Sequence, residues 1–190
     1  MTKIRQSFKI LDNRLIFKYM TKNEQKVINY MVENPQLDFL AREIEKKAKI
    51  SKAGANLALR GLIKTELIKR TKRGNIYFYS VDFNKPQIKE LKKINIITKL
   101  APLIDKLKSH TLNVILFGSV ARGENLSISD LDLFIVSHRP QKVKDIINHS
   151  SFKKKLHVVI KTPIDAMSFN NENPILAREI ESGIILWKQL

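Results

Sequence analysis

Two short polar clusters in the second half of the chain combine residue types that handle phosphate and divalent metal ions. Gly118 and Ser119 follow an apolar run, and ten residues separate Ser119 from Asp130, which is followed by Asp132. A glycine lets the backbone approach a phosphate without a Cβ clash, and the serine offers a hydroxyl. Two neighbouring carboxylates repel each other unless they share a cation. The spacing therefore predicts a site where Mg²⁺ joins nucleotide phosphates to Asp130 and Asp132.

Two expected strands would position these clusters. Residues 113–117 form a short apolar run that ends at Gly118, and residues 129–136 alternate around the two aspartates. Because alternate residues of a strand point to one side, Asp130 and Asp132 would face the same way. Residues 120–123 are expected to begin a helix, from which Arg122 would contact a phosphate or brace the acidic pair.

The sequence Phe-Gly-Ser-Val-Ala-Arg-Gly at 117–123, followed by Ser-Asp-Leu-Asp-Leu at 129–133, resembles the polymerase-β-like minimal nucleotidyltransferases, the MNT family. The resemblance extends over about residues 100–188: residues 103–107 fit the family's preceding helix, and residues 174–187 fit its closing helix and last strand. It implies transfer of a nucleoside monophosphate, often AMP from ATP or another NTP, to a protein or small molecule, with Mg²⁺ or Mn²⁺. It also implies a possible HEPN-type protein partner, since some members are antitoxins that modify one.

One position departs from the family pattern. The family's third carboxylate lies on a later strand, and the matching position of the expected strand 155–160 holds His157. A neutral imidazole could accept a proton or ligate a softer metal such as manganese, but it removes a negative charge from a magnesium site. Asp145, Asp165 or Glu124 could replace the missing acid in space, and His157 could equally be a strand residue without a role.

The first half has the element order of a winged helix-turn-helix. Helices are expected over 21–34, 38–47 and 51–64, and a hairpin is expected over 67–79 around a basic turn that contains Gly74. Residues 21–83 also resemble the archaeal-type winged-helix regulators, which implies that the third helix enters a major groove of double-stranded DNA.

A polar row on the third helix is the candidate DNA-reading surface. Its members recur at four-residue steps, on a different face from the apolar positions 55, 58, 59 and 62. Asn56 could read adenine bidentately, while the basic residues would reach phosphates or guanine edges. The DNA-binding set, with the helix cap and the wing tip, is Ser51, Lys52, Asn56, Arg60, Lys64, Lys72 and Arg73. The alternative is a winged helix that docks proteins, with the basic row merely solvated.

The distribution of charge supports the DNA hypothesis. The chain of 190 residues carries a formal net charge of +17. Residues 1–100 hold 23 Lys and Arg against 9 Asp and Glu, whereas residues 101–190 hold 12 against 9. Such asymmetry is typical of a first half that faces a polyanion. The chain has no Cys, no secretory signal and no long apolar run, so we expect a cytoplasmic protein without membrane contact.

The expected fold class is α+β, with an N-terminal winged helix-turn-helix followed by a nucleotidyltransferase (polymerase-β-like) mixed-sheet domain. We expect a basic arm at 1–20, the winged helix at 21–83, a helical linker at 84–101 and the nucleotidyltransferase domain at 102–190. The helix of the linker is expected to be interrupted at Pro102. Apolar stripes in the arm and the linker could form a homodimer seam or pack on their own domain. Two functions follow: a magnesium-dependent nucleotidyltransferase with a DNA-binding winged helix, or a catalytically weak or inactive, antitoxin-like regulator that senses a nucleotide or a partner.

Overall fold

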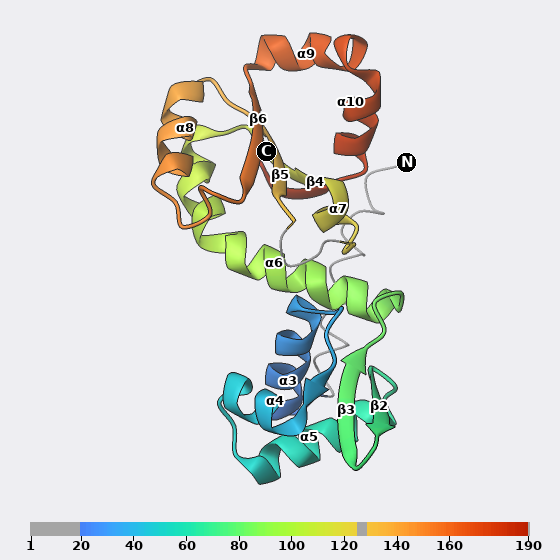
Figure 1. The fold of residues 1–190 in the computed structure, drawn as a ribbon. Helices are drawn as coiled ribbons and strands as arrows, with labels where there is room; N and C mark the ends of the chain where they lie inside the picture. Colours follow the sequence, from blue (N-terminus) through green and yellow to red (C-terminus); the bar gives the residue numbers. More distant parts are fainter. Residues whose placement is uncertain (1–19, 125–128, 190) are drawn as a thin grey trace. The chain divides into compact units, whose positions relative to one another are not determined.

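The computed structural model describes residues 20–124 and 129–189. The chain divides into two compact units, Met1–Ile94 and Asn95–Leu190. Each unit has its own sheet, and most elements of each are labelled in Figure 1. The N-terminal arm expected at 1–20, with its apolar stripe, lies outside the described residues except for Met20.

Three helices open the first unit: α3 (Lys22–Glu33), α4 (Ala41–Ala48) and α5 (Lys52–Lys64). Helix α3 begins with the predicted capping box, because the Thr21 hydroxyl accepts from the Glu24 backbone N–H while the Glu24 carboxylate accepts from that of Thr21. The predicted cap of α5 is also present, since the Ser51 hydroxyl accepts from the backbone N–H of Gly54.

The first unit also contains a three-stranded sheet, with strand order β1-β3-β2, whose first strand lies between α3 and α4. The predicted hairpin is confirmed as β2 (Ile68–Arg73) and β3 (Ile76–Val81), an antiparallel pair. The second helix was expected from residue 38, but it starts at Ala41 because Phe39 and Leu40 form the short strand β1 and pair with Tyr79 and Phe78. This element order is that of a winged helix.

The core of the first unit joins the helices to the hairpin. It contains Ala58, Leu59 and Leu62 from the predicted inner face of α5, together with residues of α3, α4 and both long strands, and the fourth predicted position, Ala55, is also buried. Ile88 and Leu91, from the linker stripe, are fully buried in this same core. That half of the stripe therefore packs within its own unit.

The expected linker and the residues that follow it form one continuous helix. Helix α6 runs from Pro86 to Leu107, so the expected interruption at Pro102 is wrong. Proline lacks the N–H that would bond the carbonyl of Thr98, but burial of Leu100, Leu103 and Leu107 in the second core holds the helix together on both sides of it. The boundary between the two units falls inside α6.

The second unit is built on a four-stranded mixed sheet of order β6-β5-β4-β7. Strand β4 (Asn113–Phe117) is antiparallel to β5 (Leu131–Val136) and β7 (Ile184–Lys188), and β5 is parallel to β6 (Leu156–Lys161). The short helix α7 (Gly118–Ala121) leaves the end of β4 directly.

Helices cover both faces of this sheet (Figure 1). Leu131, Leu133 and Ile135 of β5 pack with the C-terminal half of α6 and with α8 (Pro140–Asn148). Phe134, on the opposite face, packs with α9 (Pro163–Glu172) and α10 (Pro174–Glu181). Since Asp132 has the same parity as Phe134 along the strand, its side chain belongs to the α9/α10 face. No helix within the described ranges is long and apolar enough to cross a membrane.

Candidate active site and nucleic-acid interface

The register of the second sheet places two candidate residues, Asp132 and His157, in one row and brings Gly118 next to that row. Phe117, which precedes Gly118, pairs with Asp132 of β5, and Asp132 pairs with His157 of β6. The Gly-Ser turn, one aspartate and the histidine therefore meet at one end of strands β4, β5 and β6, although 39 positions separate Gly118 from His157 along the chain. Asp132 therefore lies beside the Gly-Ser turn, and the roles of these residues stay predictions.

Gly118 is in close contact with the Asp132 carboxylate. Its φ of +73° lies in the left-handed region, and an added Cβ would collide with Oδ2 of Asp132 and lie 3.3 Å from its Cγ. Both conditions require glycine at this position, since side chains rarely adopt this backbone conformation and the space is already filled. The absence of a side chain thus lets the Asp132 carboxylate pack directly against the backbone of the turn.

Asp130 and Asp132 differ in their surroundings. The strand was expected from residue 129 but begins at Leu131, so Asp130 lies just before it and is exposed. The Asp132 side chain is only 25% exposed. Across residues 20–124 and 129–189, no three His, Cys, Asp or Glu side chains are grouped closely enough to hold a metal ion.

His157 contacts Asp132 directly. Its Nδ1 lies 3.1 Å from Oδ1 of Asp132, while the imidazole itself is 71% exposed. The parallel register puts His157 next to Asp132 on the same face, and its position as the replacement of a third carboxylate stays a prediction. In the tautomer with hydrogen on Nδ1, that nitrogen donates to Asp132 and Nε2 is left as an acceptor.

Arg122 ties the turn to helix α10. Its Nε donates to Glu124 and its NH1 to Glu179, each at 2.9 Å. The hydrogen bond with Glu179, and to a smaller extent that with Glu124, raises the pKa of Arg122 above its usual value. The side chain braces the end of α7 against α10, and its predicted contact with a phosphate stays a prediction.

Of the acids that could replace the missing third carboxylate, Asp165 accepts a hydrogen bond from the Thr162 backbone N–H and caps α9.

The row predicted along the third helix is exposed as expected. Lys52, Asn56, Arg60 and Lys64 all face solvent on α5, opposite the buried Ala55, Ala58, Leu59 and Leu62. Leu57 lies beside the row and is 67% exposed. A helix with a basic, uncovered row next to its apolar face has the surface that groove reading requires.

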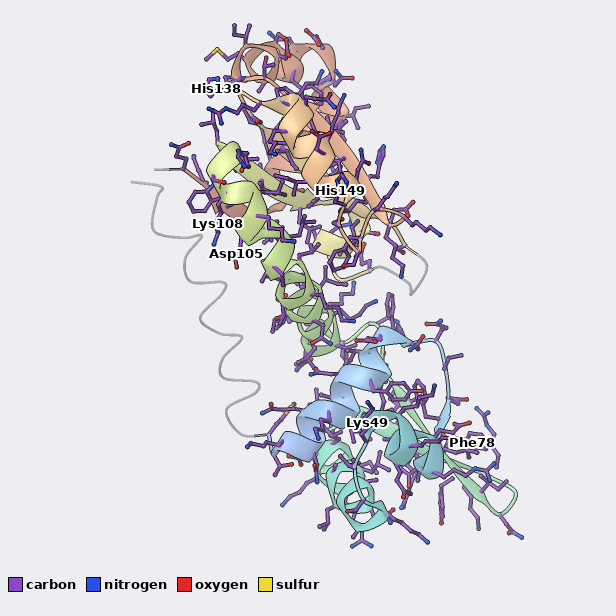
Figure 2. All side chains as sticks on the ribbon, turned by 90° about the vertical axis from the view of Figure 1, so that its left-hand side faces the viewer. Lys49, Phe78, Asp105, Lys108, His138 and His149 are labelled. Atoms are coloured by element: carbon purple, nitrogen blue, oxygen red, sulfur yellow. The ribbon has the colours of Figure 1, made fainter. Side chains whose placement is uncertain are left out.

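Of the two basic side chains predicted at the wing tip, one is exposed to solvent and the other forms an ion pair. Lys72 is exposed, whereas Arg73 pairs with Asp38 and lies 4.9 Å from the ring centre of Phe78, which is labelled in Figure 2. Arg70, which sequence reasoning did not select, lies over the ring of Tyr77 at 4.6 Å. A hollow of about 520 Å³ separates the start of α5 from this wing, and Lys52, Asn56 and Tyr77 are among its lining residues.

Comparison with known proteins agrees with the fold of the second unit. Residues 98–189 match the family described as polymerase beta, nucleotidyltransferase. This part of the chain is a nucleotidyltransferase-fold domain. No curated protein matches the chain.

Solved structures resemble the chain at low identity. A transcription regulator from Staphylococcus aureus, MepR in complex with DNA, is 16% identical, with a TM-score of 0.41, over 54% of this chain and 83% of its own. A possible transcriptional regulator from Methanosarcina mazei is 20% identical, with a TM-score of 0.37, over 54% and 88%. A putative nucleotidyltransferase from Sulfolobus solfataricus is 15% identical, with a TM-score of 0.36, over 57% and 94%.

The donor set of the nucleotidyltransferase-fold domain fits a divalent cation. Mg²⁺ is commonly held by one or two carboxylates together with substrate phosphates, rather than by a cage of protein ligands. Asp132 supplies a carboxylate beside the glycine turn, and Asp130 is two residues away. A nucleotide would have to complete such a site, since His157 adds no negative charge.

Sequence reasoning missed two residues that shape these sites. Glu179 anchors Arg122 from α10, and Asp38 anchors Arg73 at the wing. In each case 35 or more positions separate the partners in the sequence, so no local spacing pattern could reveal the pair.

Proposed function

We propose that the second unit transfers a nucleoside monophosphate, AMP from ATP, to a hydroxyl of a protein or small-molecule acceptor, while the winged helix binds double-stranded DNA. The observation that carries the transferase proposal is the contact between Gly118 and the Asp132 carboxylate. A turn without a side chain, beside a carboxylate and next to Ser119, is an arrangement suited to a triphosphate and its cation.

In the proposed reaction the acceptor oxygen attacks the α-phosphorus in line. A new P–O bond forms to that oxygen, the bond from the α-phosphorus to the α,β-bridging oxygen breaks, and pyrophosphate leaves. Gly118 and Ser119 would bind the triphosphate through backbone N–H groups and a hydroxyl. His157, oriented by its hydrogen bond with Asp132, would accept the acceptor's proton at Nε2.

Asp130 and Asp132 would hold Mg²⁺ or Mn²⁺. When bound, the ion lowers the negative charge of the phosphoryl group under attack. The protein's own contribution is position: the antiparallel register holds Asp132 next to the turn, and the Arg122–Glu179 ion pair holds the end of the turn's helix.

A second function is favoured by His157. Its place beside Asp132 removes one negative charge from the site, and a catalytic metal that is bound more weakly can abolish useful turnover. Under this alternative the protein is a catalytically weak or inactive, antitoxin-like regulator, in which the second unit senses a nucleotide or a partner and the winged helix acts on DNA. A HEPN-type partner, homodimerisation and a cytoplasmic location belong to either proposal.

Label transfer from α-labelled ATP distinguishes the two functions. The native protein is incubated with ATP and either Mg²⁺ or Mn²⁺, in the presence of cell protein and metabolites as acceptors, and compared with Asp132→Asn. Asp105→Asn is the matched control, since Asp105 is an exposed carboxylate on α6 that pairs with Lys108. The transferase proposal expects label that disappears in Asp132→Asn and persists in Asp105→Asn. Equal label with all three proteins would show that the proposed site is wrong. ATP binding without label supports the regulator.

A further inference from the structure

A second candidate surface lies on the other face of the nucleotidyltransferase-fold sheet. Helices α6 and α8 flank a groove of about 880 Å³, and the loop between α8 and β6 closes one end of it. Figure 2 shows this side of the molecule, with His149 at the end of α8 and Asp105 on α6. Both helices pack on the face that Leu131, Leu133 and Ile135 present, so the groove does not share residues with the Asp132 site.

The floor of the groove is apolar. Leu103 of α6 is almost fully buried, while Ile146 and Phe152 are half-buried and pack against the core beneath. Pro102 lies at the surface of α6 along the groove. A floor of this kind offers anchor sites for side chains spaced along one face of a helix.

The rim of the groove is basic. Lys99, Lys106 and Lys142 line it and are exposed, and Asp145 is its single acidic residue. The Asp145 carboxylate accepts a hydrogen bond from Gln141 Nε2 at 3.3 Å, which satisfies part of its capacity within α8. Positive charge around an apolar floor is complementary to an amphipathic segment whose polar face is acidic.

We propose that this groove binds an acidic amphipathic helix of a partner protein. Two other occupants have the wrong charge. Residues 1–19 of this chain carry Lys3, Arg5, Lys9, Arg14 and Lys18 against Asp12, so they have the same sign as the rim. A second copy docked about a two-fold axis would bring the same lysines face to face. The apolar floor favours a protein helix over a nucleic acid, whose contacts would be dominated by phosphates.

The test measures fluorescence anisotropy of labelled peptides with the full-length protein. One 18-residue peptide has leucines at helical i, i+4, i+7 and i+11 spacing and glutamates elsewhere, and a second replaces every glutamate by lysine. We expect the acidic peptide to bind at least about tenfold more tightly, with an affinity that falls as salt rises.

Charge reversal on the rim locates the binding. Lys106→Glu with Lys142→Glu is expected to weaken the acidic peptide about tenfold or more. The matched control is Lys144→Glu with Lys188→Glu, two exposed lysines outside the groove, which should change the affinity less than about twofold. Phe152→Ala should also weaken binding, and thermal unfolding checks that this variant is folded.

Four results would overturn the proposal. The first is no binding of the acidic peptide, or equal binding of both peptides. The second is an equal effect of the rim and control variants. The third is that a synthetic peptide of residues 1–19, or single-stranded RNA, binds the groove more tightly than the acidic peptide and displaces it. The fourth is a change of oligomeric state in the rim variant by sedimentation. The proposal does not rest on the transferase function, and ATP binding should be the same in rim variant and native protein.

Discussion

The contact between Gly118 and Asp132 makes a sharp prediction at the scale of single residues. Gly118→Ala adds both left-handed backbone strain and a collision with the carboxylate, so we expect ATP affinity to fall at least about tenfold and stability to fall by more than about 1 kcal/mol. Gly74→Ala is the matched control, because Gly74 has a φ of +59° with no atom within 4 Å of the added Cβ. Isothermal titration with ATP and thermal unfolding measure the two effects. Equal losses in both variants would contradict the role of the collision.

His157 gives a second prediction at this scale. Replacing it with aspartate places a negative charge beside Asp132, where the parallel register holds the pair. If the protein is the catalytically weak regulator, His157→Asp should raise Mg²⁺-dependent label transfer from ATP about tenfold or more, because a third carboxylate strengthens binding of a hard cation. His138→Asp, at an exposed position after β5, is the control. If His157→Asp lowers transfer instead, His157 acts as the base rather than as a weakened ligand.

At the scale of elements, helix α5 and the wing separate packing residues from reading residues. Replacing Lys52, Arg60 and Lys72 with alanine should weaken binding to duplex DNA at least about tenfold. Each lost phosphate contact should also reduce the slope of log K against log salt by about 1. Fluorescence anisotropy at several salt concentrations measures both quantities.

The control removes the same number of positive charges from the second unit. Lys153, Lys154 and Lys188 are exposed there, and their replacement by alanine should change DNA affinity only slightly. A similar loss in both variants would mean that the net charge, rather than the α5 surface, determines binding. A flat salt response of the native protein would favour protein docking by the winged helix.

Helix α6 contains a buried lysine that should make stability depend on pH. Lys92 is 4% exposed and lies 4.4 Å from the ring centre of Phe83. Burial, with a smaller effect of Lys89, lowers its pKa to about 8. Below pH 8 the lysine is protonated in both folded and unfolded chains, so the cost of burying its charge is fully present. Between about pH 8 and 10.5 the unfolded chain binds the extra proton, so the free energy of unfolding rises with pH.

Lys92→Met isolates this contribution. The variant should be more stable than the native protein at pH 7, by up to about 3 kcal/mol, and the difference should shrink as the pH approaches 10. Urea unfolding at both pH values measures it. A difference that does not depend on pH would show that Lys92 is not buried in its charged form.

At the scale of the whole molecule, the two units have separate hydrophobic cores. Leu59 is buried in the first core and Leu133 in the second. We expect Leu59→Ala and Leu133→Ala each to destabilise by about 2–5 kcal/mol, and each to lower the midpoint of a different thermal transition. Calorimetry measures the midpoints. A single transition that both variants shift equally would show that the units unfold together.

Local sequence patterns determined the elements that depend on neighbouring residues. The capping box at Thr21, the cap at Ser51 and the two faces of α5 all follow from spacings within one helix, and the structure has them where they were expected. The Gly-Ser turn after an apolar strand and the strand that contains Asp132 could likewise be predicted from neighbouring residues alone. The fold class followed because these elements occur in an order that only a few architectures accommodate.

Only the tertiary structure decided features that depend on partners distant in sequence. Pairing with β3 turned residues 39–40 into a strand, and burial on the second sheet carried α6 through Pro102. The pairing of Asp132 with His157 and the ion pairs Arg122–Glu179 and Arg73–Asp38 join segments 25 or more residues apart. Such contacts arise from sheet register and packing, which stabilise the chain only once it is folded. Spacing along the sequence therefore does not encode them.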